Sequence, residues 1–556
     1  MTLDTVNWDP ERKGSFKTEY VKLSEPYENF IRNLSSSEGR SLFWWATLLS
    51  SRDTWMTSVL YDSAILSFVM EEIEKDNRIN VIVVEHRGVA KTLQRYCSQK
   101  KRKVKIIVSE RIKRRKAPVF ARFLVNYFRF IRSVQRRKKY INKNKVNHIK
   151  EDNRYLLIQT DVFPQDFSDR KFTSRDFRNL SEYAKEEILF LPYLQASQTE
   201  EEELIRFCGD CKNAKFLFRE KYIDTDDYKS LIRYYRYCRH LSRKKFFLNG
   251  MDISQIVRED LVLSSYSLNS FWCLTNESLF RKLQGQGFQI RKLIDGYEAQ
   301  PSSRGTFIGI HRYYPKVKTI GYVCLPLDGM NPGFFPTKEE TDFDAVPQKI
   351  AVIGEIFRQL YQDRCPQTET ILAPGFRLQS VFLKGKKAEL KKLVNKTVLV
   401  PLPYPVSDAV FLLRLLDECS EYLRRKRITV VLKNHPVRRL YDFQDYGIER
   451  PTYNYKKTEE PISELMDESD VVMTSTGSSG FESVLNGLPV IMTSADALCY
   501  TYMPREWENK YYHVVDDANS LLKALEHYLE GSFRPISYQP QYLVQTTQET
   551  VLKLLE

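Results

Sequence analysis

A short stretch near the end of the chain limits the possible fold most strongly. Residues 471–492 read VVMTSTGSSGFESVLNGLPVIM, in which two apolar segments flank a turn of small residues and a short helical segment. An apolar strand that leads through a tight turn into a helix and then into a second apolar strand is typical of a parallel sheet with helices packed on it. The stretch therefore predicts an α/β domain.

The same alternation of strands and helices extends along most of the chain. Because 556 residues exceed the size of one ordinary domain, we predict two Rossmann-like α/β domains with a cleft between them. Long helices are expected at 40–75 and 197–245, and strands at 79–86, 154–163, 188–194, 291–299, 318–327, 349–355, 396–403, 428–436, 469–475 and 488–494.

A loop rich in proline, glycine and acidic residues, 328–347, separates two runs of this alternation and is the expected linker. The N-terminal domain is accordingly predicted at 1–340 and the C-terminal domain at 346–535. Residues 536–556 are expected to contain a last helix that crosses back to the first domain.

Positive charge is concentrated in one segment. Residues 101–150 contain 19 lysine and arginine residues and one acidic residue, Glu110, so the rest of the chain is slightly negative although the whole chain carries +15. A helix starting at Pro118 would present a polar stripe beside a wide aromatic and aliphatic face. The stripe consists of Arg122, Asn126, Arg129, Ser133 and Arg136, and the apolar face includes Phe123 and Phe128.

An aromatic face flanked by cations favours a helix that lies in the surface of an anionic membrane. We expect its membrane contacts at Arg122, Phe123, Phe128, Arg129 and Arg136. The alternative is a helix packed on its own domain with a solvated basic edge. Nucleic acid is not expected as a partner, because no nucleic-acid-binding module accompanies the basic run.

The N-terminal residues 1–14 are polar, so we expect no signal peptide, and no run approaches the roughly 18 apolar residues of a membrane span. Scattered cysteines are typical of a reducing cytoplasm. Cys208, Cys211, Cys238 and His240 could hold zinc, but the chain between the two pairs is helical in pattern, which favours ordinary thiols.

The turn TSTGSSGFE has the composition of an anion site. In open α/β sheets, ligands bind beyond the carboxyl ends of the strands, and free N–H groups at a helix start bind phosphate. Glu482, one turn into the helix, would accept hydrogen bonds from a sugar diol, and phosphate with a diol describes a nucleotide. The alternative is a well-capped helix without a ligand. The phosphate-binding candidates are Ser475, Thr476, Ser478 and Ser479.

A second motif, KNHP, ends the strand-like segment ITVVL. Proline after His435 disfavours the helical conformation there, so the ring would project into the cleft. A lone histidine is usually structural. Here Lys433, His435 and Pro436 fall at the sheet edge where the serine turn is also expected, together with Arg438 and Arg439.

KNHP followed by STGSSGFESVLNGLPV resembles bacterial GT-B glycosyltransferases that use CMP-activated sugars, including sialyltransferases, polysialyltransferases and Kdo transferases of capsule or lipopolysaccharide. The resemblance implies a GT-B-like fold with His435, Ser478 and Ser479 at the nucleotide phosphate and Glu482 at the ribose. RDFRNL, YEAQP and IGY look similar to surface-polysaccharide biosynthesis proteins, which extends the likeness over most of the chain. CDP-glycerol glycerophosphotransferases share the histidine and serine arrangement.

The D/E-D/E-G motif that carries the catalytic acid of sialyltransferases is not found, so the carboxylate is expected from the first domain, facing the cleft. Glu298 is the first candidate for a base or nucleophile, and Asp260 and Asp176 are the next. Asp161 and Glu85 also follow strands. No DxD-like pair lies near the serine turn, which favours a reaction without a metal.

The resemblance implies a glycosyltransferase that moves an acidic sugar (Kdo, sialic acid or a related nonulosonate) from a CMP-sugar to a bacterial surface glycan or lipid-linked acceptor. It would act at the inner face of the cytoplasmic membrane. Three alternatives stay open: a CDP-glycerol glycerophosphotransferase, a UDP-sugar GT-B transferase, and a non-catalytic scaffold in polysaccharide assembly.

Overall fold

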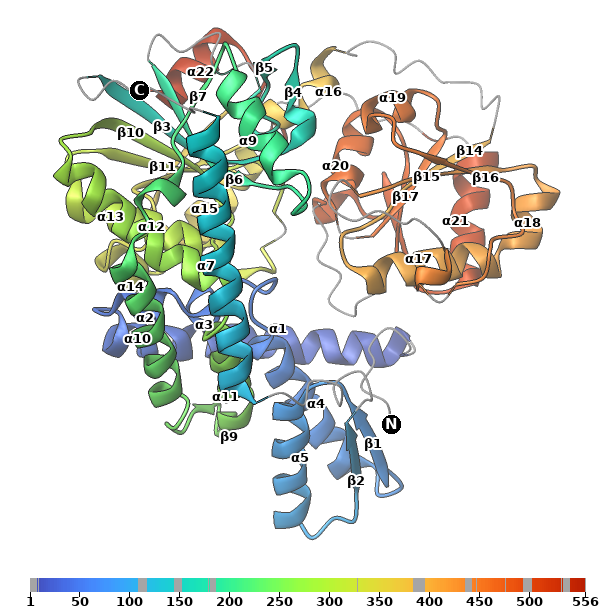
Figure 1. The fold of residues 1–556 in the computed structure, drawn as a ribbon. Helices are drawn as coiled ribbons and strands as arrows, with labels where there is room; N and C mark the ends of the chain where they lie inside the picture. The colour runs from blue at the N-terminus through green and yellow to red at the C-terminus, as the bar shows by residue number, and fades with distance from the viewer. Residues whose placement is uncertain are drawn as a thin grey trace.

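The structure is a computed structural model with two separate sheets of parallel strands, each covered by helices (Figure 1). This arrangement confirms the predicted fold class, α/β and GT-B-like, with two Rossmann-like domains. The structure describes residues 8, 10–108, 118–144, 153–178, 180, 187–327, 329–383, 396–435, 443–446, 448–475, 477–493, 503–531, 533 and 541–555.

The first sheet has seven strands in the order β13-β12-β11-β10-β3-β6-β7. Most residues of its central strands are buried, as expected where helices cover both faces of a parallel sheet, although Arg154, Gln289 and Arg291 are exposed. The strands are β3 (Arg154–Val162), β6 (Ile188–Leu194), β7 (Lys215–Phe216), β10 (Gln289–Gly296), β11 (Lys318–Val323), β12 (Lys349–Val352) and β13 (Glu369–Leu372).

Helices of the first domain surround this sheet and extend beyond it. The helix predicted at 40–75 is divided into α2, α3 and α4, and that predicted at 197–245 is divided into α9 and α10 by β7 and a 3-10 turn. The helices are α1 (Pro10–Glu38), α2 (Leu42–Trp45), α3 (Leu48–Ser51), α4 (Val59–Lys75), α5 (Arg87–Gln99), α7 (Val119–Lys143), α9 (Glu201–Asp210), α10 (Thr225–Leu241), α11 (Ser254–Ser264), α12 (Leu268–Gly285), α13 (Pro301–Tyr313), α14 (Lys338–Asp342), α15 (Glu355–Arg364) and α16 (Ser380–Leu383).

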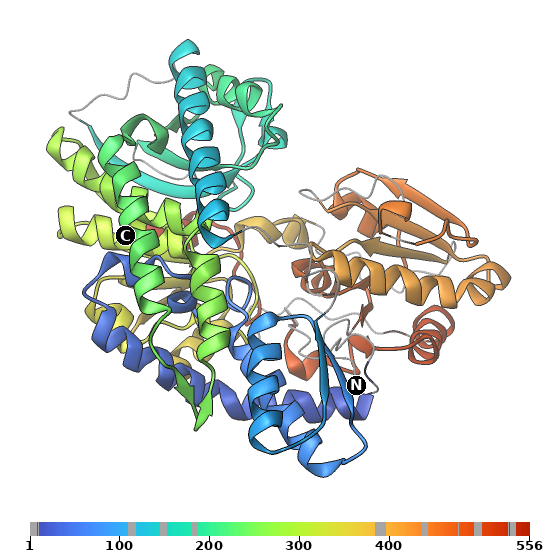
Figure 2. The same cartoon turned by 60° about the horizontal axis from the view of Figure 1, so that its bottom comes forward.

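Two further features belong to the N-terminal part. β1 (Val81–Val84) and β2 (Lys105–Val108) pair in parallel on either side of α5 and form a small separate unit. Helix α1 reaches from the first domain towards the second in both views (Figures 1 and 2), and Lys13 Nζ lies 5.5 Å from the centre of the Phe411 ring. The N-terminal helix therefore contacts both domains.

The second sheet has six parallel strands in the order β16-β15-β14-β17-β18-β19. Its strands are β14 (Thr397–Pro401), β15 (Thr429–Lys433), β16 (Tyr455–Thr458), β17 (Val471–Thr474), β18 (Val490–Thr493) and β19 (Tyr512–Val515). The remaining helices are α17 (Val406–Glu418), α18 (Ser420–Arg425), α19 (Ile462–Asp467), α20 (Ser478–Leu485), α21 (Ala518–Glu530) and α22 (Gln548–Leu555).

The change from one sheet to the other does not occur at the predicted boundary. The strand expected to open the second domain is β12, which pairs with β11 in the first sheet, and β13 adds to it. The boundary predicted at residues 340–346 is therefore wrong, because the sheets change between β13 and β14. The expected linker 328–347 instead connects two neighbouring strands of one sheet.

This loop is packed rather than extended. Pro332, Gly333 and Phe334 are buried, and a Cβ on Gly333 would lie 2.8 Å from the Asp53 Cα. Such a close approach of two backbones requires glycine. A proline- and glycine-rich composition is thus explained here by tight packing against the turn that follows α3.

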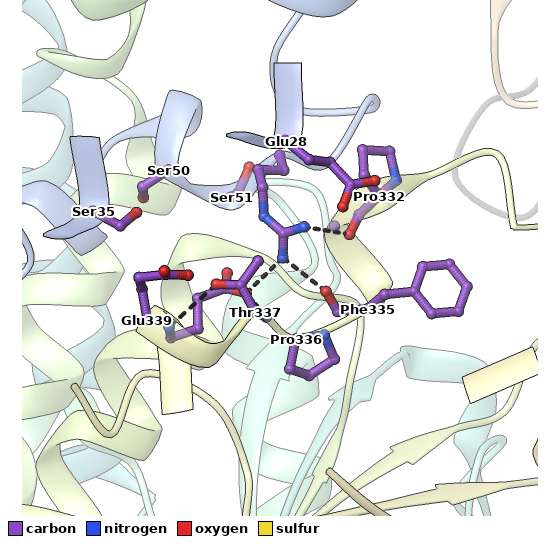
Figure 3. Close-up of polar contacts among 12 residues, drawn as sticks. Glu28, Ser35, Ser50, Ser51, Pro332, Phe335, Pro336, Thr337 and Glu339 are labelled. Atoms are coloured by element: carbon purple, nitrogen blue, oxygen red, sulfur yellow. Dashed lines mark hydrogen bonds and ion pairs between the residues drawn. The ribbon is translucent and has the colours of Figure 1, made fainter. Parts of the chain in front are cut away.

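A buried ion cluster fixes the same loop. Arg52 donates to the carbonyl oxygens of Pro332 and Phe335 at 2.9 Å each and pairs with Glu340 at 2.5 Å (Figure 3). The other carboxylate oxygen of Glu340 pairs with Arg304, and all three side chains are buried. One carboxylate therefore joins α14 to α13 and to the residue that follows α3.

The C-terminal segment returns to the first domain. The Val544 amide donates to the Ile353 carbonyl at 2.7 Å, and the Gly375 amide donates to the Val544 carbonyl at 2.9 Å. Helix α22 then buries Val551 and Leu554 in the core of the first sheet. The chain therefore crosses between the domains twice.

We expect Glu340→Gln to destabilise the protein strongly. Glutamine keeps the shape of the side chain but leaves two buried guanidinium groups without a counter-charge, so the free energy of unfolding should fall by roughly 3–5 kcal/mol. Denaturant unfolding followed by circular dichroism measures this loss. Glu339→Gln is the matched control, because Glu339 pairs with the half-exposed Arg32; its loss should stay below about 1 kcal/mol. Equal losses would contradict the role of the cluster.

Candidate functional site

The order of the second sheet locates a crevice at the carboxyl ends of its strands. In chain order the strands lie 3-2-1-4-5-6, so the direction of strand addition reverses between β14 and β17. Loops that leave neighbouring strands towards opposite faces of a sheet open a crevice at this switch point, and ligands of open α/β sheets bind there. A ligand of this domain is therefore expected at the loop after β14 and the loop after β17.

A buried hydrogen bond connects these two loops. The Ser475 hydroxyl, just after β17, donates to Asp408 Oδ2 at 3.2 Å, and Asp408 lies in the first turn of α17. Ser407 donates to the other oxygen of Asp408 at 3.1 Å. Ser475 is fully buried, so its hydroxyl fixes the crevice rather than facing it. This finding changes its predicted role from phosphate contact to support.

The start of α20 is arranged for an anion. Gly477 occupies the N-cap position and has no side chain with which to cap the helix. The Gly480 N–H donates to the Gly477 carbonyl at 3.3 Å, so among the described residues the N–H groups of Ser478 and Ser479 are left for a ligand, at the end of the helix where the dipole favours negative charge. Ser478 and Ser479 are partly exposed there, and the Ser479 hydroxyl lies 3.3 Å from the Thr474 hydroxyl.

Glu482 lies one turn further along α20 and is partly exposed. Residues four apart share a helix face, so Glu482 follows Ser478 along one side of α20. A carboxylate there suits a sugar hydroxyl better than a phosphate, because like charges repel. Thr476, also predicted at this turn, lies outside the described residues.

His435 follows β15 and faces an aromatic residue from the neighbouring loop. Its ring centre lies 5.4 Å from that of Tyr404, at an angle of 66°. Tyr404 follows β14 and is 48% exposed, so the two rings stand together at the edge of the crevice. Sequence reasoning missed Tyr404; an exposed tyrosine between two prolines after the first strand of a Rossmann-like sheet was the available signal.

The remaining residues of the KNHP motif are placed differently. Lys433 Nζ donates to the Glu459 carbonyl at 3.0 Å, and the Asn434 amide donates to the Glu459 carboxylate at 2.7 Å. Lys433 therefore reaches towards the end of β16. Pro436 lies outside the described residues.

The first sheet carries a cavity of about 220 Å³ at the carboxyl ends of its strands. Glu298 and Asp176, two of the predicted catalytic carboxylates, both line it, and so does Asp161 from the end of β3. The Gln300 side chain donates to Glu298 at 2.8 Å, and Arg175 lies 3.2 Å from Asp176. Three carboxyl groups from separate loops thus meet in one small cavity.

Burial and mutual repulsion change the charge of this cluster. Burial, with smaller contributions from Asp161 and Asp176, raises the pKa of Glu298 to about 8. Burial also raises the pKa of Asp161. Glu298 therefore holds a proton at neutral pH, as expected for acidic groups that share a poorly solvated site.

Sequence reasoning missed two polar side chains of the cavity. Asp295, near the end of β10, is buried and accepts a hydrogen bond from Gln159 at 2.6 Å, and burial raises its pKa to about 6. The guanidinium carbon of Arg219 lies 3.8 Å from the centre of the Tyr193 ring. Both are polar side chains near the carboxyl ends of strands β10 and β6, and that position was the available signal.

Asp260 does not belong with these residues. It is buried in α11, accepts a hydrogen bond from the Thr57 hydroxyl at 2.6 Å, and lines a different cavity, together with Glu85. Burial raises the pKa of Asp260 to about 7. Asp260 therefore does not line the cavity of Glu298 and Asp176, because α11 directs it towards the N-terminal helices.

Helix α7 corrects part of the membrane prediction. Phe123 is buried and stacks on Tyr235, with ring centres 4.4 Å apart. Arg136 pairs with Glu201 at 2.6 Å, and Arg122 donates to the Tyr266 hydroxyl at 3.3 Å. These three residues are thus engaged within the domain, because one face of α7 packs against α10 and α12.

The opposite face of α7 is apolar in its first half. Phe120, Val125 and Phe128 are 54%, 48% and 52% exposed. Arg129 and Arg132 are exposed in the next turn. The predicted polar stripe is therefore not the most exposed line of the helix, and the predicted contacts Phe128 and Arg129 do lie at the surface.

Two absences concern only the residues that the structure describes. Within these ranges no group of three or more histidine, cysteine, aspartate or glutamate side chains is arranged to hold a metal ion. None of the described helices is both long enough and apolar enough to cross a membrane.

No protein-family model matches the chain, and no curated protein matches its sequence. The chain is similar to the UDP-GlcNAc 2-epimerase of Methanocaldococcus jannaschii in complex with UDP-GlcNAc and UDP, with 13% identity, a TM-score of 0.45 and coverage of 72% of this chain and 98% of that chain. For the UDP-GlcNAc 2-epimerase of Neisseria meningitidis bound to UDP-GlcNAc, the identity is 13%, the TM-score 0.44 and the coverage 72% of this chain and 99% of that chain. For the wall teichoic acid polymerase TagF soaked with CDPG, the identity is 12%, the TM-score 0.32 and the coverage 78% of this chain and 91% of that chain. Because these TM-scores are below 0.5, we base the function on the residues described above.

The raised pKa of Glu298 predicts a pH-dependent stability. The folded state keeps this proton up to about pH 8, whereas a free glutamate releases it near pH 4.3. Stability should therefore fall as the pH rises from about 5 to 8, and Glu298→Gln should remove that part of the fall. The melting temperature of the variant relative to wild type should rise over this window. Asp210→Asn, at an exposed position of α9, should show no such trend. A flat difference for Glu298→Gln would contradict the shift.

Proposed function

We propose that the protein is a glycosyltransferase that takes a nucleotide-activated sugar. The observation that carries the proposal is that His435, Tyr404 and a glycine-started helix follow three adjacent strands, β15, β14 and β17, at the carboxyl edge of a 3-2-1-4-5-6 sheet. An anion site, a cationic or hydrogen-bonding ring and an aromatic face at one crevice match the phosphate and base of a nucleotide.

The nucleotide would bind with its phosphate at the start of α20. The first-turn N–H groups, with Ser478 and Ser479, would donate hydrogen bonds to the phosphate, and His435 would donate from the next loop. Glu482 would accept from the ribose hydroxyls. Donors held in place before the reaction stabilise the charge that develops on the departing nucleotide. Such donors would neutralise the phosphate without a metal, which keeps metal independence as part of the proposal.

The first-domain cavity would receive the acceptor. In the transfer, an acceptor hydroxyl oxygen bonds to the anomeric carbon, the bond from that carbon to the phosphate oxygen breaks, and the hydroxyl proton passes to a carboxylate. Glu298 and Asp176 line this cavity. Since Glu298 keeps its own proton below about pH 8, it would accept the proton of the acceptor hydroxyl only above that pH, and Asp176 is the second candidate for this role.

For the donor, we propose a CMP-activated acidic sugar and a bacterial surface glycan or lipid-linked acceptor. This choice rests on the resemblance of the KNHP and serine motifs to CMP-sugar transferases. A UDP-sugar donor or CDP-glycerol would use the same anion site. These alternatives therefore differ in which nucleotide stabilises the protein.

We also propose that the enzyme works at the anionic inner face of the cytoplasmic membrane. The support is the exposed row Phe120, Val125 and Phe128, followed by Arg129 on the same helix. An apolar row flanked by cations partitions into the surface of an anionic bilayer.

Thermal stabilisation by nucleotides tests the donor site. A ligand present at about 100 times its dissociation constant should stabilise the folded state by roughly 2.7 kcal/mol. We expect CMP to raise the melting temperature of the wild type, and His435→Ala to lose most of that rise because a phosphate donor is removed. His240→Ala, an exposed histidine of α10, is the matched control and should keep the rise.

Other outcomes of this experiment decide between donors. Stabilisation by UDP alone would replace the CMP-sugar by a UDP-sugar, and stabilisation by CDP-glycerol beyond that by CMP would favour a glycerophosphotransferase. Absence of stabilisation by any nucleotide would contradict the proposed function and favour a scaffold.

Co-sedimentation with vesicles tests the membrane surface. Replacing Phe120 and Phe128 together by serine removes two exposed aromatic side chains, so partitioning onto phosphatidylglycerol vesicles should fall at least about tenfold. Val21→Ser, which removes a 54% exposed side chain from α1, should leave partitioning unchanged. Equal partitioning of the double variant and wild type would exclude this face of α7.

A further inference from the structure

A cavity that the proposed function does not use lies among the N-terminal helices. It measures about 470 Å³ and is bounded by α4, α5, α7 and α11, with the end of α10. This volume is within the usual range of small-molecule sites. It also lies beyond the carboxyl end of β1, where the β1-α5-β2 unit would place a ligand.

The acidic side chains around this cavity are already bound by protein donors. Asp62 accepts from the Ser58 hydroxyl at 2.7 Å and lies 2.6 Å from His86 Nδ1. Glu259 accepts from the Gly88 amide at 2.7 Å, and Asp260 accepts from Thr57. Three of the four lining carboxyl groups are therefore satisfied within the protein, and the fourth, Glu85, is exposed.

Some of the cationic side chains of this cavity also have partners within the protein: Arg258, for example, donates to the Ser242 carbonyl at 3.0 Å. The cavity is lined by Arg87, Lys91, Arg122, Arg239 and Arg258. Across the described residues, neither Lys91 nor Arg239 has an ion pair, although each lines the cavity from a different helix. Positive charge without a counter-ion around a concave site attracts an anion.

His86 adds a fixed donor to these cations. It stands between β1 and α5, lines the cavity, and has its Nδ1 held by Asp62, while its side chain is 40% exposed. With Nδ1 engaged, Nε2 is the nitrogen available to a ligand. The carboxylate of Asp62 raises the pKa of His86 to about 9, so the ring is protonated at neutral pH and Nε2 is a donor.

We propose that this cavity binds a phosphate group, held by His86, Lys91 and Arg239. Two convergent cations and a charged imidazole recognise a doubly charged phosphate monoester or diphosphate better than a singly charged diester. Val119 and Arg122 of α7 line the same cavity, and the exposed Phe120 and Val125 follow in the same helix. The phosphate can therefore come from the headgroup of a membrane lipid or from a free phosphorylated molecule.

Binding measurements with two kinds of probe test the proposal on the whole chain. Isothermal titration with glycerol 3-phosphate measures the free source. Co-sedimentation with phosphatidic acid vesicles, compared with phosphatidylglycerol vesicles of equal charge, measures the lipid source. We expect Lys91→Glu with Arg239→Glu to weaken binding of at least one phosphate probe by about tenfold or more. A preference for phosphatidic acid that is lost in the double variant would assign the lipid headgroup, and titration with glycerol 3-phosphate alone would assign the free source.

The matched control is Arg95→Glu with Arg236→Glu. It reverses two exposed charges on the same helices, α5 and α10, outside the cavity lining. It should bind as the wild type does. Equal losses in the two double variants, or absence of binding to both probes, would overturn the proposal. Lys91→Gln with Arg239→Gln is a milder second variant if the charge reversal impairs folding, and the CMP melting shift checks the nucleotide site independently.

Discussion

The rest of the first domain depends on one buried carboxylate between two buried guanidinium groups. Glu340 pairs with both Arg52 and Arg304, and all three side chains are excluded from water. Such a cluster costs desolvation energy, so it holds only with its geometry complete. Arg304 lies in the first turn of α13, which begins directly after the loop of Glu298. The cluster therefore fixes a wall of the carboxylate cavity as well as the loop that joins β11 to β12.

The second domain is attached to this frame through the helix that would bind the nucleotide. Phe481 of α20 stacks on Trp507 at 5.4 Å and also meets Phe357 of α15 at 6.1 Å. Tyr542 of the returning C-terminal segment packs against the other edge of Trp507. One side of α20 is thus buried between the two sheets while its start faces the crevice. A shift of α20 would disturb the contact between the domains, which would couple the proposed nucleotide binding to domain position.

The central strands of both sheets could be predicted from the sequence, whereas the strands at the sheet edges could not. Strands such as β3 and β17 are buried on both faces and read as continuous apolar runs. Four missed strands, β7, β13, β16 and β19, are the outer strands of the two sheets, where one side needs no apolar partner. The wrong prediction of a linker at 328–347 also arises from contacts that the sequence does not reveal. Glu340 looked like one more acidic residue of a loop, because its two partners lie far away in sequence.

The candidate site divides in the same way. Positions after central strands were predictable: His435, Ser478, Ser479 and Glu298 all follow strands of the two sheets at their carboxyl ends. Asp176 lies instead in the connection between β3 and β6. The place of Asp260 could not be predicted, because it lies in a helix, where the direction of a side chain depends on packing rather than on strand order.

The two cavities of the first domain differ in the charge of the ligand that they would attract. The carboxylate cavity would repel an anionic donor if all its groups were ionised, and the proton kept by Glu298 lowers that repulsion. Lys91 and Arg239, which have no ion pair among the described residues, instead line the cavity beside α7, where they would attract an anion.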